Sequence, residues 1–174
     1  MPDSSSLLAR TFGFLGAVAV AISTLVAWYD YQVILATRPI VSLFEVPVDL
    51  WNLYPLAAAL LLGGALVAMA LLAMPPAIAP RTPSLVAALI GLGIAVYGVV
   101  RCFDIPNLGI HAGPRNGVAA HTAIDAGPLL ALVGGLMIVV GSLVVAVAAS
   151  RAARPAGARA RRPRHGGAAP PSPA

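Results

Sequence analysis

Four long stretches of uncharged, apolar residues constrain this chain more than any other feature. They cover residues 11–28, 56–74, 83–100 and 129–149, and none contains Asp, Glu, Lys, Arg or His. A bilayer core of about 30 Å is crossed by roughly 20 apolar residues in a helix. Because a backbone in hydrocarbon must satisfy its own hydrogen bonds, each stretch is predicted to be a transmembrane helix.

Composition supports a membrane environment. Of the 174 residues, 59% are hydrophobic and 10% are charged, whereas soluble domains carry about 25% charged residues. A chain this short would leave too much apolar surface exposed in water. The predicted class is therefore an all-α membrane protein, an antiparallel four-helix transmembrane bundle with a short β element in the first outer loop. Val, Ile and Phe cluster there, between Pro39 and Pro47, as in strands.

The predicted organisation has two parts. Residues 1–150 form the four-span membrane domain with outer loops at 29–55 and 101–127, and residues 151–174 form a disordered basic tail. Arginine, the sole basic residue apart from histidine, is concentrated on the side of the termini. By the positive-inside rule both termini are cytoplasmic, as in a multi-pass protein of the plasma membrane.

A cleaved signal peptide at residues 1–28 is the alternative reading of the first stretch. It contains small-residue triplets such as Ala17-Val18-Ala19, which resemble cleavage sites. However, the apolar run is long for a signal sequence and ends in aromatic residues. A retained helix is therefore predicted, while cleavage would leave three spans.

Small residues on each span indicate how the helices pack. In lipid, close helix contact relies on such residues because little hydrophobic force acts between helices. Packing within one chain is the simpler interpretation, although the same residues could serve homodimerisation. The predicted packing residues are Gly64, Ala68, Ala87, Gly91, Ala95 and Gly134.

The membrane interior offers no ionisable group, which weighs against a proton-coupled pump or an ion exchanger. No catalytic sequence motif is present either, so we expect neither enzymatic activity nor a cofactor. The single cysteine, Cys102, excludes an intramolecular disulfide. It is expected to be a packing residue.

The first outer loop is unusually apolar for a solvated segment, and an exposed apolar surface often marks an interaction site. Phe44, Trp51 and Tyr54 are the expected partner-binding residues. A lid folded over the outer end of the bundle is the simpler interpretation of the same residues.

The second outer loop contains His111 and His121 together with Asp104 and Asp125. These types can ligate zinc, but their spacing fixes no coordination geometry, so no metal site is predicted. Asp104 is expected to pair with Arg101 instead. Asp125 and Thr122 have the spacing of a helix-capping box before the fourth span.

The tail is expected to contact anionic headgroups, at about 1 kcal/mol per arginine near the surface. It lacks the aromatic partners and fold of a nucleic-acid binder. The contacting residues are Arg151, Arg154, Arg159, Arg161, Arg162 and Arg164.

Two outer loops, a last span that begins Gly127-Pro128-Leu129, and a basic tail resemble the small, uncharacterised four-span membrane proteins of GC-rich bacteria. That resemblance implies no activity and no site residues. The layout is also similar in topology to claudin-type proteins, but their paired loop cysteines are missing here. We expect a non-enzymatic accessory or scaffold protein of the cell envelope that binds a membrane-protein partner through its outer loops. The alternative is a small transporter or channel component that acts as a homo-oligomer.

Overall fold

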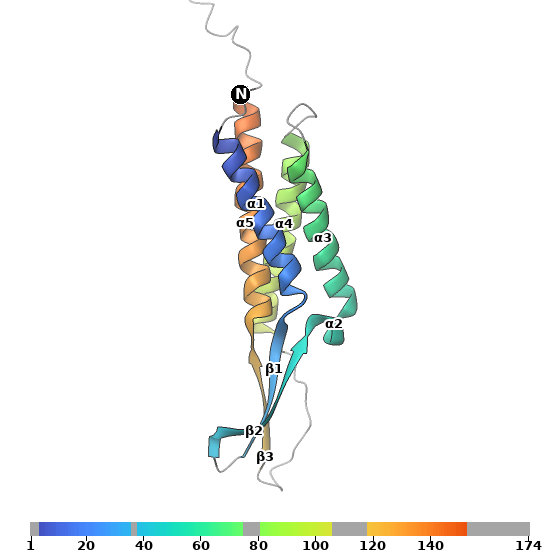
Figure 1. Ribbon diagram of the computed structural model, residues 1–174, viewed down its shortest axis with the longest axis vertical. Coiled ribbons are helices and arrows are strands. Elements are labelled where there is room, and N and C mark those ends of the chain that lie inside the picture. The colour runs from blue at the N-terminus through green and yellow to red at the C-terminus, as the bar shows by residue number, and fades with distance from the viewer. Residues whose placement is uncertain (1–3, 36–37, 75–80, 106–117, 153–174) are drawn as a thin grey trace, which may run out of the picture.

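The computed structural model describes residues 4–35, 38–74, 81–105 and 118–152. Four long helices form a bundle, and a narrow sheet projects from one end of it (Figure 1). The four helices are long and apolar enough to cross a membrane, as the four apolar stretches predicted. They are α1 (Ser4–Ser23), α3 (Pro55–Ala73), α4 (Arg81–Phe103) and α5 (Ala126–Ala152).

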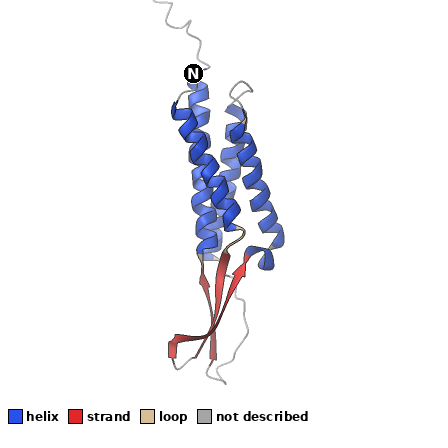
Figure 2. Cartoon of the chain, in the orientation of Figure 1, coloured by secondary structure: helices blue, strands red, loops and turns tan. Residues whose placement is uncertain are grey.

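The sheet has three antiparallel strands in the order β2-β1-β3 (Figure 2). They are β1 (Ala27–Leu35), β2 (Arg38–Asp49) and β3 (Val118–Ile124), and a short helix, α2 (Leu50–Leu53), follows β2. The β element predicted in the first outer loop is present. The all-α class was nevertheless too narrow, because the second loop contributes β3 and both loops therefore build one sheet.

The first span ends earlier than predicted, at Ser23 rather than Trp28. Ser23 Oγ donates to the carbonyl of Val20 over 2.7 Å, and Thr24 Oγ1 donates to that of Ala21 over 2.8 Å. These hydroxyls bond to carbonyls of the last turn, where the helix itself leaves carbonyls without partners. The aromatic and β-branched residues that follow favour a strand, so Trp28 lies in β1.

The predicted capping box is also wrong. Thr122 lies in β3 opposite Tyr31, so it cannot cap a helix. Asp125 alone marks the boundary, with Oδ1 accepting a 2.7 Å hydrogen bond from the backbone N–H of Ala126. Pairing with β1 holds the chain extended up to Ile124, and α5 can begin only after that residue.

Helix α5 lies against α1 and α4 at very short range. A Cβ added to Gly134 would lie 2.6 Å from the carbonyl oxygen of Gly16 in α1. One added to Gly135 would lie 2.7 Å from the carbonyl oxygen of Gly91 in α4. Both distances are below the contact distance of real Cβ atoms, so the helix backbones touch where glycine leaves room.

The other predicted packing residues lie at similar interfaces. Ala87 and Ala68 are fully buried, and Ala95 presents its backbone N 2.7 Å from the Cβ position of Gly135. Gly64 is less crowded, since its nearest neighbour would be a methyl group of Ile90 at 3.3 Å.

Candidate functional site

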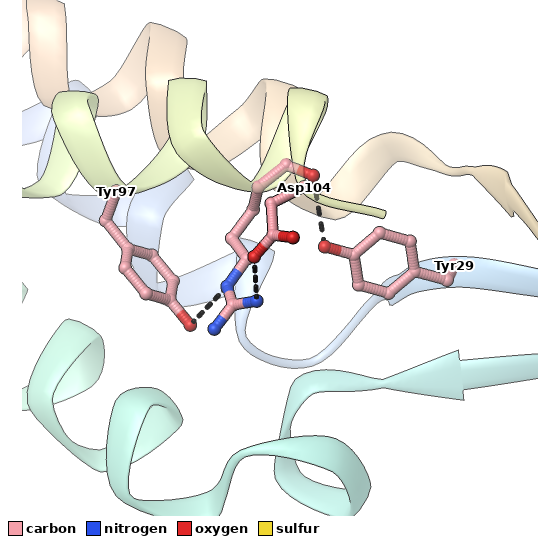
Figure 3. Close-up of polar contacts among 4 residues, drawn as sticks. Tyr29, Tyr97 and Asp104 are labelled. Atoms are coloured by element: carbon pink, nitrogen blue, oxygen red, sulfur yellow. Dashed lines mark hydrogen bonds and ion pairs between the residues drawn. The ribbon is translucent and has the colours of Figure 1, made fainter. Parts of the chain in front are cut away.

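The junction between the bundle and the sheet holds a cluster of polar and aromatic side chains around Arg101, in the last turn of α4 (Figure 3). Arg101 Nη1 lies 3.3 Å from Asp104 Oδ2, which is the predicted ion pair. Arg101 Nε donates to the Tyr97 hydroxyl over 3.2 Å. The guanidinium also lies 4.1 Å from the centre of the Tyr54 ring, within the range of a cation–π interaction. Arg101 thus connects the end of α4 to the beginning of α3.

Strand β1 joins the same cluster through two fully buried aromatic residues. The Tyr29 hydroxyl donates to the carbonyl of Arg101 over 3.1 Å. The Trp28 ring lies 5.8 Å from the Tyr97 ring, centre to centre, and its Nε1 donates to the carbonyl of Ser23. Gly127 packs against the Trp28 ring where any Cβ would clash. The base of the sheet is therefore fixed to α1, α4 and α5.

Burial raises the pKa of the Tyr29 phenol to about 12, although the positive charge of Arg101 acts in the opposite direction. An unfolded chain would ionise this phenol near pH 10, while the folded protein keeps it protonated. The contribution of Tyr29 to the free energy of unfolding is therefore complete below about pH 10 and is lost as pH rises through about 12.

The pH dependence of unfolding tests this assignment. We expect the free energy of unfolding in detergent to fall between about pH 10 and 12, because the unfolded phenol ionises first. Tyr29→Phe should remove that part of the decline, at the cost of one hydrogen bond, about 0.5–1.5 kcal/mol. Equal slopes for both proteins in this interval would contradict a buried, protonated Tyr29.

The three predicted partner-binding residues occupy different elements. Trp51 lies in α2 with 38% of its surface exposed. Phe44 lies in β2 opposite Val33. Tyr54 precedes α3, and Arg101 covers one face of its ring. Tyr54 therefore has a structural contact that the sequence did not reveal, because Arg101 comes from a distant part of the chain.

The remaining candidates are dispersed. Within the described ranges, no group of three or more His, Cys, Asp or Glu residues could hold a metal ion. His121 lies in β3 opposite Gln32, and His111 falls outside the described residues. Cys102 is partly buried and is a free thiol. Arg151 is exposed in the last turn of α5. The other tail arginines lie outside the described residues: Arg154, Arg159, Arg161, Arg162 and Arg164.

Sequence reasoning identified the Arg101–Asp104 pair but missed Tyr29, Trp28 and Tyr97 as its neighbours. The aromatic character of Trp28 and Tyr29 pointed to the membrane interface, and no local signal joins β1 to α4. Tyr97 lies four residues before Arg101 in α4, a spacing that places both on one helix face and could have indicated their contact. Comparison with protein-family models, with curated proteins and with solved structures finds no match. Chemically, the cluster is a cation among aromatic rings, ion-paired with one exposed carboxylate. Such an arrangement is suited to holding two structural parts together.

Proposed function

We propose that this protein is a non-enzymatic accessory or scaffold protein of the cell envelope, which presents its sheet to a partner protein outside the membrane. The observation that carries the proposal is the anchoring of β1 at the Arg101 cluster, which holds the sheet at a fixed place beyond the bundle. Strands β2 and β3 form the two edges of this sheet. Edge strands can pair with a strand of another protein.

In this proposal the protein is a multi-pass protein of the plasma membrane with both termini in the cytoplasm. The distribution of arginines supports that orientation. A retained first helix is supported by Arg10, whose Nη1 donates to the carbonyl of Met74 over 2.7 Å at the end of α3. Arginine is favourable there because carbonyls at a helix C-terminus lack partners. The intact mass of the purified protein should include residues 1–28.

The tail arginines, beginning with the exposed Arg151, are proposed to contact anionic headgroups on the cytoplasmic side. Such contacts would reinforce the orientation, because each arginine near the surface adds about 1 kcal/mol of attraction. Nucleic acid is not part of the proposal.

The partner surface is tested by affinity capture from native membranes after crosslinking. We expect one heterologous membrane protein to be recovered with the wild type, and much less with Trp51→Ala or Phe44→Ala. Phe12→Ala is the matched control, because Phe12 is 41% exposed, close to the value for Trp51, but lies in α1.

Unchanged recovery with both variants would show that the surface is wrongly chosen. A homo-oligomer that carries measurable flux in liposomes would contradict the scaffold proposal altogether. It would favour a small transporter or channel component instead.

A further inference from the structure

An apolar groove runs between α3 and α4, from near the middle of α4 towards the sheet. Its volume is about 270 Å³. The groove is open at Gly93, where an added Cβ would meet no atom within 4 Å. Its lining includes Ala57, Leu60 and Gly64 from α3 and Leu89, Gly93 and Tyr97 from α4.

The length of the groove matches one leaflet of a membrane. At about 1.5 Å per residue, Leu89 to Tyr97 extends over about 12 Å along α4. Half of a hydrocarbon core is about 15 Å thick. A transmembrane helix of a second copy would be about 10 Å wide and would cross both leaflets. A single acyl chain is therefore the better match to a groove about as long as one leaflet is thick.

The end of the groove nearest the sheet is polar, and it lies beside the ion pair of Arg101 with the exposed Asp104. Tyr97 lines the groove, and its hydroxyl accepts a hydrogen bond from Arg101 Nε. Arg101 lies one turn further along α4 and also covers the Tyr54 ring, so it bridges the space between the two helices. Within the described part of the chain, Arg101 donates through Nε to Tyr97 and through Nη1 to Asp104, and neither bond uses Nη2. Guanidinium N–H groups bind phosphate strongly.

We propose that the groove binds one phospholipid of the leaflet nearest the sheet, with an acyl chain along Gly64 and Gly93 and the phosphate on Arg101. The apolar lining accommodates the chain, and the charge of Arg101 complements the phosphate at the level where headgroups begin. Lipid binding in this groove is not required for the proposed scaffold function. The two proposals are therefore tested independently.

The acyl-chain site is tested in nanodiscs that contain a phospholipid with a photoactivatable group on its acyl chain. After irradiation, mass spectrometry should find the label concentrated on groove residues such as Leu60 and Leu89. Gly93→Leu should abolish this labelling, because leucine fills the groove. Gly63→Leu is the matched control: Gly63 also has no atom within 4 Å of its Cβ position, but it does not line the groove.

Equal labelling of Gly93→Leu and Gly63→Leu would overturn the site, as would label spread evenly over all lipid-facing positions. Dimers that cross-link through this face and disappear in Gly93→Leu would show that a second copy occupies the groove. The headgroup contact is tested with a diacylglycerol that carries the same photoactivatable chain. Weaker labelling by diacylglycerol is expected, and equal labelling would exclude recognition of the phosphate.

Discussion

Replacing Trp28 by alanine is expected to destabilise the protein by about 3–5 kcal/mol, the usual cost of removing a buried tryptophan side chain. Trp28 is fully buried between Tyr97 and Gly127, and its indole N–H is bonded to the carbonyl of Ser23. Alanine would leave a cavity and an unpaired carbonyl at the base of the sheet. The free energy of unfolding in detergent measures the loss, and hydrogen exchange should become faster in β1.

Trp28→Phe separates packing from hydrogen bonding. Phenylalanine keeps most of the ring volume but cannot donate to Ser23, so a smaller loss than for alanine is expected. Phe12→Ala removes a partly exposed aromatic ring far from the junction and is the control for a general effect of aromatic loss. An alanine variant at Trp28 as stable as the wild type would contradict the anchoring of the sheet.

The second large effect is expected from Gly135→Ala, which should destabilise the bundle by about 1–3 kcal/mol through overpacking. The added methyl group would lie 2.7 Å from the backbone of α4 at both Gly91 and Ala95. Neither backbone atom can move without displacing a helix. Unfolding in detergent again provides the measurement.

Gly63→Ala is the matched control for Gly135→Ala, because nothing lies within 4 Å of its Cβ position. Alanine has a higher helix propensity than glycine by about 1 kcal/mol, so Gly63→Ala should be neutral or stabilising. If both variants had the same stability, the close contact between α4 and α5 would be wrong.

The helices could be predicted from the sequence because lipid imposes a simple requirement on them. An uncharged run of about 20 residues in hydrocarbon has few alternatives to a helix. The helix-packing residues could be predicted in part, because close helix contact in lipid relies on small residues. Glycine and alanine recur at four-residue spacing in the second and third apolar stretches. Gly13, Gly16 and Gly98 escaped notice, although their Cβ positions are also crowded. These glycines contact other helices, and the sequence does not indicate which helix each one faces.

The sheet and its junction were harder to predict. Trp28 and Tyr29 follow an apolar run and therefore suggested the end of a membrane span, whereas they begin β1. Strand β3 has the sequence VAAHTAI, in which three of the seven residues are alanine. Apolar and polar residues do not clearly alternate along it. It becomes a strand because it pairs with β1, as in Tyr31 opposite Thr122. Such pairing joins distant segments and leaves little local signal.

The four-span topology with an outward-facing sheet is tested most directly by determining the side of the membrane on which the sheet lies. In a Cys102→Ser background, Asn52→Cys places an exposed thiol beside the sheet, and Arg151→Cys places one at the opposite end of α5. In intact cells, a membrane-impermeant maleimide should label Asn52→Cys directly and Arg151→Cys only after permeabilisation. The reverse pattern would contradict an outward-facing sheet, and labelling of both sites in intact cells would contradict the four-span arrangement.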